Sequence, residues 1–445
     1  MAIPGELPVI NRDAVEKTIL TGLALHCRIA EAAVFARKNY HYADLPKGYQ
    51  ISQYELPLCL DGWLEIETEG GDKRIGITRA HLEEDTGKLT HVDGYSLVDL
   101  NRAGVPLLEI VTEPDLRSAE ESRAYLTKLQ SILRYLQVSA ADMEKGQMRC
   151  EANVSVRPVG RAAFGTKVEI KNLNSFRAVK QSLDYEVARQ IAQLEAGQRV
   201  VQVTMGGDEE HGHTIVQRVK ESSDDYRYFP EPDLPPLAPQ RAWVADIEAR
   251  MPELPDAKAE RFVTQLGLDR RDALMLVAER AVAAYFEAVV VAAQRRGSGL
   301  QPRTVANWIT GELFRLMNAA GTSIAGLPIT GVPVTPDQFA ELLALSATGK
   351  INLNSAKQAL GIMFETGHSA SDVVQELGLA QVSDSDALSQ VVRQVLERYP
   401  DEITKYRSGK AGMLDWLMGQ VMRETRGKAN PNVVRELLQR ALTLT

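Results

Sequence analysis

Apolar and polar residues alternate without interruption between residues 147 and 157, and this pattern predicts a β-strand with two unlike faces. One face carries Met148, Cys150, Ala152, Val154 and Val156, and the other carries Arg149, Glu151, Asn153, Ser155 and Arg157. Residues 166–171 repeat the alternation, with Lys167, Glu169 and Lys171 on the polar side. If the two strands pair, they form a sheet with one apolar face and one densely charged face.

The rest of the first half reads as mixed α/β with mainly antiparallel strands. Period-two patterns predict further strands over residues 63–69, 73–82, 107–112 and 200–205. Ser118 and Ser175 are typical N-caps, and each is followed by a helical pattern, to about Leu136 and to Glu195 respectively.

Seven of the chain's 20 prolines lie between Pro230 and Pro255, which disfavours regular elements there and indicates an interdomain connection. Beyond it the pattern is helical, for example over residues 303–318, 336–345 and 354–365. A softer, polar boundary lies at residues 382–385. The expected fold class is therefore α+β, with an antiparallel-sheet domain over residues 1–250, a helical domain over 251–381 and a helical tail over 382–445.

Composition narrows the functional classes. A net charge of −8 argues against binding nucleic acid over the whole surface, but residues 391–445 hold ten Lys/Arg against six Asp/Glu. The three cysteines, Cys27, Cys59 and Cys150, form no CxxC pair, and the N-terminus lacks a signal-peptide pattern, so we expect a cytoplasmic protein. The apolar segment 281–293 is interrupted by Glu287 and is too short to span a bilayer, so we expect a buried helix.

The charged face permits two interpretations. A solvated outer face is common in antiparallel sheets. However, Glu83, Glu84 and Glu109 add carboxylates at or near other strand ends, and carboxylates with interleaved Arg and Lys suit Mg²⁺ and the phosphates that it bridges. No P-loop or GxGxxG run is present. His81 lies beside the acidic residues, and we expect it to be a surface residue of a strand.

Seven motifs occur in a characteristic order. They are residues 37–40 (RKNY), 46–53 (PKGYQISQ), 81–85 (HLEED), 99–109 (DLNRAGVPLLE), 149–155 (RCEANVS), 171–176 (KNLNSF) and 224–233 (DDYRYFPEPD). Together they closely resemble the B-subunit family of the aspartyl/glutamyl-tRNA amidotransferases, from about Pro4 to the C-terminus.

The resemblance implies a cradle-shaped, kinase-like domain that uses ATP and Mg²⁺ to phosphorylate the side-chain carboxyl of Glu-tRNA(Gln) or Asp-tRNA(Asn), after which ammonia displaces the phosphate. Glu84 and Glu109 match family positions that bind Mg²⁺, which makes them the expected catalytic metal ligands. Arg149, Glu151, Asn153 and Lys171 match positions expected to contact nucleotide or phosphate. Lys38 and Lys47 match motifs that line a passage for ammonia, although ordinary surface lysines would look the same.

The family also implies partners: an amidase (glutaminase) subunit, a small linking subunit and the tRNA. In this family the C-terminal helical domain binds tRNA, so the resemblance implies that the basic residues of the tail contact tRNA. The alternative is that these residues only form a solvated helix face. These residues are Lys405, Arg407, Lys410, Arg423, Arg426 and Lys428, with Arg435 and Arg440 nearby. The 224–233 motif either packs aromatic rings to close the cradle or touches substrate.

In similar proteins a strand carrying Glu-Val-His precedes the motif that stands here at residues 4–11, and that strand supplies a Glu and a His to the metal. We expect a start assigned too late rather than a true truncation, and an exposed pairing edge where that strand would lie. The competing hypothesis is a non-catalytic tRNA-binding scaffold. A stand-alone ligase is a third, less favoured one, because the sequence has no glutaminase signature.

Overall fold

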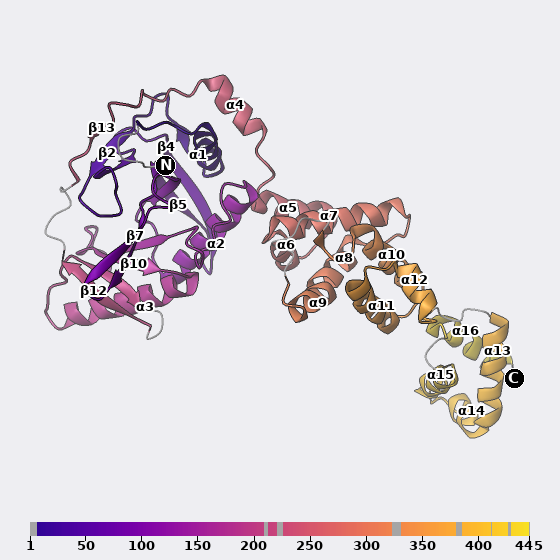
Figure 1. Cartoon of the computed structure of the whole chain (residues 1–445). Helices are drawn as coiled ribbons and strands as arrows, with labels where there is room; N and C mark the ends of the chain where they lie inside the picture. Colours follow the sequence, from indigo (N-terminus) through magenta and orange to yellow (C-terminus); the bar gives the residue numbers. More distant parts are fainter. Residues whose placement is uncertain are drawn as a thin grey trace. The chain divides into compact units, whose positions relative to one another are not determined.

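A computed structural model describes residues 7–208, 212–219, 226–322, 331–379, 385–410, 412–425 and 429–444. The chain divides into two compact units, residues 1–254 and 255–445. Figure 1 shows that the strands lie in the first unit, whereas the second is built from helices. This arrangement confirms the predicted α+β class.

Two four-stranded sheets dominate the first unit. The first has the order β1-β4-β5-β8, from β1 (Arg28–Ile29), β4 (Cys59–Thr68), β5 (Gly71–Glu84) and β8 (Pro106–Thr112), and is antiparallel. The second has the order β12-β11-β10-β9, from β9 (Cys150–Val154), β10 (Val168–Leu173), β11 (Val203–Asp208) and β12 (His213–Val219). Here β9 pairs antiparallel with β10, which meets the condition set above for a sheet with one charged face, while β10 and β11 are parallel.

Two smaller sheets are also present among the described residues of this unit. Strands β2 (Ala36–Asn39), β3 (Tyr49–Ser52) and β13 (Phe229–Pro230) form one, in the order β13-β2-β3. Strands β6 (Lys88–Val92) and β7 (Tyr95–Asp99) form an exposed hairpin.

The α-helices in the described part of the first unit are α1 (Arg12–Ala24), α2 (Ala119–Tyr135), α3 (Phe176–Glu195) and α4 (Arg241–Ala249). Ser118 and Ser175 cap α2 and α3 as predicted, because each side-chain oxygen accepts a hydrogen bond from a backbone N–H of the first turn. Helix α3 packs on the second large sheet, and one apolar core joins the two large sheets through residues such as Ile77, Leu129 and Ile170.

Two expectations were wrong in detail. The 147–157 strand is shorter than its alternation, because only Cys150–Val154 pairs with β10. The proline-rich connection contains α4, since residues 240–251 between its two groups of prolines contain none.

The described residues of the second unit form two separate apolar cores. The first is built by α5 (Pro255–Leu266), α6 (Arg270–Val277), α7 (Arg280–Arg295), α8 (Pro302–Trp308), a π-helical turn η2 (Ile309–Leu313), α9 (Phe314–Ala319), α10 (Pro336–Ala347), α11 (Leu353–Thr366) and α12 (Ala370–Glu376). The second core is built by α13 (Ser385–Arg398), α14 (Pro400–Arg407), α15 (Gly412–Glu424) and α16 (Pro431–Leu444). Helix α7 covers the apolar segment 281–293 and buries it, as predicted. Within the described residues no helix is both long and apolar enough to cross a membrane.

Candidate functional site

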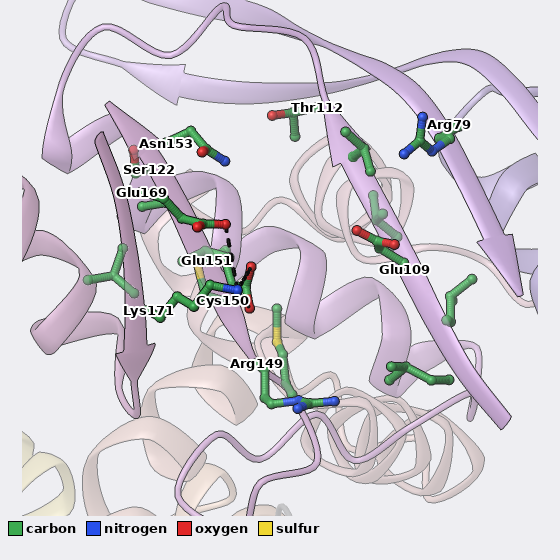
Figure 2. A pocket seen from close by; sticks show the side chains of 18 of the residues that line it. Arg79, Glu109, Thr112, Ser122, Arg149, Cys150, Glu151, Asn153, Glu169 and Lys171 are labelled. Carbon is green, nitrogen blue, oxygen red and sulfur yellow. Dashed lines mark hydrogen bonds and ion pairs between the residues drawn. The ribbon is translucent and has the colours of Figure 1, made fainter. Parts of the chain in front are cut away.

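A cavity of about 3130 Å³ opens within the first unit, and both large sheets contribute to its wall. Figure 2 shows Arg79 and Glu109, from β5 and β8, on one side of it, with Glu151, Asn153, Glu169 and Lys171 of β9 and β10 on the other. The charged sheet face predicted from the alternation therefore faces this cavity.

The β5–β8 wall carries a compact group of three titratable side chains. The strand register places His81 opposite Glu109, and the pleat puts Glu83 on the same face as His81. His81 Nε2 lies 3.1 Å from Glu109 Oε2 and 3.9 Å from Glu83 Oε2. One ligand atom from each of the three residues lies within 4.8 Å of the others. His81 is 1% exposed, so the expectation of a surface histidine was wrong.

The two carboxyls of this group titrate differently. Burial raises the pKa of Glu83, and the neighbouring Glu109 charge raises it further. Burial also favours the neutral form of Glu109, but the hydrogen bond from His81 and the charges of His81, Lys38 and Arg79 outweigh it, so the pKa of Glu109 is lowered. Two acidic groups this close repel each other when both are ionised.

A divalent cation fits this group. Two carboxylates are the hard oxygen donors that Mg²⁺ prefers, and bound positive charge relieves their repulsion. His81 Nδ1 is buried and has no hydrogen-bond partner within the structure as described. Glu83 and Glu109 are therefore the side chains that could hold Mg²⁺, with His81 beside them.

Glu84 lies on the other face of β5, away from Glu109. Its oxygens accept hydrogen bonds from Lys47 Nζ at 2.5 and 2.7 Å, and one also accepts from the backbone N–H of Ile51 at 3.0 Å. The structure thus brings Glu83 beside Glu109 and pairs Glu84 with Lys47, while metal binding by the Glu84–Glu109 pair stays a prediction. Side chains of a strand alternate between its two faces, so residues 81 and 83 share one face and residue 84 lies on the other. This alternation, counted from His81, points to Glu83 in the sequence.

The opposite wall carries a lysine between two carboxylates. Lys171 Nζ lies 2.9 and 3.0 Å from the two oxygens of Glu151 and 3.6 Å from Glu169 Oε1. Burial would lower the pKa of Lys171, but the two glutamates outweigh it and raise the pKa. Asn153 sits opposite Glu169 in the strand register. The sequence-predicted residues Glu151, Asn153 and Lys171 thus form one patch.

Arg149 belongs to a different contact. It precedes β9, and its Nη2 lies 2.8 Å from Asp85 Oδ1, while Arg102 Nη2 lies 3.1 Å from Asp85 Oδ2. Arg149 still lines the cavity, together with Arg102 and Asp85. Asp85 and Arg102 belong to the motifs at residues 81–85 and 99–109, but no part in the site was predicted for them.

The two lysines expected along an ammonia passage are in different surroundings. Lys38 lines the cavity, and its Nζ lies 4.9 Å from the ring centroid of Tyr226. Lys47 is paired with Glu84, is 10% exposed and does not line the cavity.

The described part of the 224–233 motif contributes cavity-lining residues and a contact to β2. Asp224 and Asp225 lie outside the described residues. Tyr228 lines the cavity and stacks on Tyr54, with ring centroids 4.3 Å apart. Glu231 accepts two hydrogen bonds from the guanidinium of Arg37, at 2.7 and 2.8 Å, and so holds the segment against β2.

The basic tail residues differ in how they are paired. Arg426 and Lys428 lie outside the described residues. Lys405 forms an ion pair with Glu402 at 3.2 Å, and Arg435 with Asp415 at 2.7 Å. Arg407, Lys410 and Arg423 are not buried, and none has an ion-pair partner among the residues that are described.

Comparison with known proteins gives one consistent result. Residues 1–245 match the family model described as the GatB/GatE catalytic domain, and residues 284–442 match the model described as the GatB domain. The chain is 52% identical over 443 residues to the aspartyl/glutamyl-tRNA(Asn/Gln) amidotransferase B-subunit of Roseiflexus castenholzii, covering 99% of this chain and 91% of the relative. Proteins of the same name from Moorella thermoacetica and Thermomicrobium roseum are each 51% identical over 446 residues, covering 99% of this chain and 91% and 90% of the relatives.

Proposed function

This chain belongs to the GatB family of amidotransferase subunits, and from that membership we propose that it activates the side-chain carboxyl of Glu-tRNA(Gln) or Asp-tRNA(Asn) with ATP and Mg²⁺ for amidation. The partners are an amidase subunit that releases ammonia from glutamine, a small linking subunit and the aminoacyl-tRNA. The protein works in the cytoplasm, where these substrates are.

The proposed reaction has two steps. A carboxylate oxygen of the substrate attacks the γ-phosphorus of ATP, which gives an acyl phosphate and ADP. Ammonia then adds to the acyl carbon, phosphate leaves, and the nitrogen loses a proton to yield Gln-tRNA(Gln) or Asn-tRNA(Asn). Phosphorylation is needed because phosphate leaves far more readily than oxide or hydroxide.

The observation that carries this proposal is the pair Glu83 and Glu109 in a cavity with cationic side chains on its walls. When bound there, Mg²⁺ would neutralise negative charge on the transferring phosphoryl group. His81 holds the Glu109 carboxylate by a hydrogen bond. Lys171 and Arg149 contact phosphate oxygens, and Glu151 and Asn153 orient the nucleotide.

Lys38 is the better supported of the two lysines for guiding ammonia. It lines the cavity, and its charge acts on both Glu83 and Glu109. Lys47 has an indirect role in this proposal. Its ammonium group is paired with Glu84 and holds that side chain on the face of β5 opposite to His81. The basic tail is proposed to hold the body of the tRNA by phosphate contacts that carry no sequence information.

The test is to trap the proposed acyl phosphate with hydroxylamine. The chain, assembled with its amidase and linking subunits, is incubated with Mg-ATP and Glu-tRNA(Gln) without glutamine or ammonia, and hydroxylamine is added. We expect ADP formation that depends on the aminoacyl-tRNA, and a hydroxamate on the glutamyl side chain. Binding of tRNA without ADP formation would instead support the scaffold hypothesis.

A further inference from the structure

The segment that joins β9 to β10, residues 155–167, is here called the rim loop. Most of its residues line the cavity that also contains Glu109. It carries three cations, Arg157, Arg161 and Lys167, and no Asp or Glu, although the whole chain has a net charge of −8. None of these three forms an ion pair within the part of the chain that the structure describes, so their charge is available to an anionic ligand.

An aromatic ring accompanies these cations. Phe164 is 56% exposed, and the guanidinium carbon of Arg157 lies 4.6 Å from its ring centroid. If a flat ligand covered this ring, hydrophobic burial and stacking would both favour binding. Arg157 also donates a hydrogen bond to the backbone carbonyl of Ala162 and so holds the chain close to the ring in place.

The base of the rim loop is fixed by a buried side chain of α3. Gln190 is fully buried: its Oε1 accepts from the N–H of Val156 at 3.1 Å, and its Nε2 donates to the carbonyl of Val154 at 3.2 Å. Glu186, also fully buried, accepts from the same Nε2 at 2.9 Å. Gln190 thus takes the place of a neighbouring strand where β9 ends, and the loop leaves the sheet at a defined point.

The loop closes tightly at its other end as well. A Cβ on Gly165 would lie 2.2 Å from the carbonyl oxygen of Val156, so only glycine fits there. A loop fixed at both ends can present Phe164 and its cations without a large ordering cost on binding.

Free cations beside an exposed aromatic ring suit a ligand that offers phosphates and a flat base, and this combination is common in proteins that bind single-stranded nucleic acid. We propose that the rim loop binds the single-stranded 3′-terminal nucleotides of the substrate tRNA, with Phe164 stacking on a base and Arg161 and Lys167 contacting phosphates. This inference rests on the proposed function, which requires the aminoacylated 3′ end to reach the cavity. It assigns ATP elsewhere, to the Mg²⁺ group and Lys171.

The test uses the full chain assembled with its amidase and linking subunits. The variants are Phe164→Ala, the double variant Arg161→Ala/Lys167→Ala, and Phe164→Trp as a replacement that keeps a stacking ring. Val159→Ala is the matched control, since Val159 is an apolar, fully exposed residue of the same loop. Binding is measured for uncharged tRNA and for the same tRNA lacking its three 3′-terminal nucleotides, and the KM for ATP is measured separately.

We expect Phe164→Ala to weaken binding of intact tRNA about 10-fold, to leave the shortened tRNA unchanged and to leave the KM for ATP unchanged. The double variant should also weaken intact tRNA and reduce the salt dependence of its binding. Phe164→Trp and Val159→Ala should bind like wild type. Equal weakening of both tRNAs would overturn the proposal, and so would a change confined to the KM for ATP, which would identify the stacked base as adenine of ATP.

These binding measurements need no turnover. An assembled wild type that forms no ADP with Glu-tRNA(Gln) would contradict the proposed function. A wild type that binds intact and shortened tRNA equally well would contradict the rim-loop assignment alone.

Discussion

His81 and Glu109 face each other across β5 and β8, with 3.1 Å between Nε2 and Oε2, and Glu83 lies on the same face. The hydrogen bond from His81 lowers the pKa of Glu109, whose side chain is 45% exposed and lines the cavity. The acidic group is thus positioned by strand register, not by a flexible loop.

The first prediction concerns the two candidate metal ligands. Glu83→Gln and Glu109→Gln should each reduce ATP-dependent activation by about 100-fold or more, because each removes a charged oxygen donor from the proposed Mg²⁺ site. Glu84→Gln is the matched control: it changes the adjacent residue on the opposite face and should leave the Mg²⁺ concentration for half-maximal activity unchanged. A rise in that concentration for Glu84→Gln, with none for Glu83→Gln, would return the ligand role to Glu84.

The second prediction concerns the histidine beside them. His81→Ala should raise the Mg²⁺ concentration needed for half-maximal activity by about 10- to 100-fold, the usual effect of losing a group that orients a ligand. Saturating Mg²⁺ should restore most of the activity, which separates orientation of the metal site from a direct part in the reaction. An unaltered Mg²⁺ titration would contradict this role.

The third prediction concerns the Arg37–Glu231 pair. Burial pushes the pKa of Glu231 up, but the Arg37 hydrogen bonds and the backbone N–H of Asp233 outweigh it, so the folded-state pKa lies below the ordinary value of 4.5. The pair therefore contributes stability above pH 4.5, and this contribution is lost as the pH falls through the lower, folded-state pKa. When denaturant unfolding is compared between pH 7 and a pH below about 4, wild type should therefore lose more stability than Glu231→Gln, which lacks this one contribution.

At pH 7, Glu231→Gln should itself cost about 2 kcal/mol, because it removes the charge-assisted hydrogen bonds between Glu231 and Arg37 and leaves Arg37 with only its second ion pair, to Asp233 at 3.1 Å. The control is Glu31→Gln, which breaks the highly exposed pair with Arg241 and should change stability by less than about 0.5 kcal/mol. Equal effects of the two substitutions would show that the Arg37–Glu231 contact does not secure β13.

The fourth prediction concerns the tail. Replacing the cations Arg407, Lys410 and Arg423 by Ala should raise the KM for aminoacyl-tRNA and reduce the salt dependence of tRNA binding by roughly one unit of log–log slope per lost phosphate contact. Basal ATP hydrolysis should not change, and removal of residues 382–445 should have the same effects in larger measure. Arg435→Ala is the control, since Asp415 already neutralises Arg435. An unchanged KM after removal of the whole tail would exclude its part in tRNA binding.

The fifth prediction tests packing at two glycines. A Cβ at Gly62 would lie 2.5 Å from the carbonyl oxygen of Leu25 and 2.4 Å from Cys27 Sγ, so Gly62→Ala should lower the free energy of unfolding by about 2 kcal/mol. Gly361 lies inside α11, and nothing is within 4 Å of a Cβ placed there. Gly361→Ala should instead stabilise by about 0.5–1 kcal/mol, as measured by denaturant unfolding of the second unit.

The sequence predicted the elements whose signals are local. Alternation identified β9 and β10 and their charged face, and serine caps located the starts of α2 and α3. The short strands β2, β3 and β13 were not predicted, because two to four residues carry too little periodicity and their pairing joins Ala36 to Pro230, far apart in the chain.

The candidate site was predicted in part for the same reason. Glu151, Asn153 and Lys171 share neighbouring strands, so alternation alone placed them together. The group of His81, Glu83 and Glu109 depends on the register between β5 and β8 and on which face of that sheet lines the cavity, whereas motif matching selected Glu84, one residue away. Burial of His81 could not be read from its polar neighbours, because the β3 residue Ser52, whose hydroxyl lies 3.3 Å from His81 Nε2, is distant in sequence.

The opposite roles of Glu83 and Glu84 have a consequence at the level of the gene. Inserting or deleting a single codon within β5 would exchange the two faces of the strand beyond that point. Glu84, which now pairs with Lys47, would then lie on the face of Glu109, and Glu83 would lie on the opposite face. Point substitutions at exposed positions of β5 leave this assignment intact. We therefore expect length changes in this part of the protein to be confined to turns, such as the exposed one at Asp93–Gly94 that joins β6 to β7.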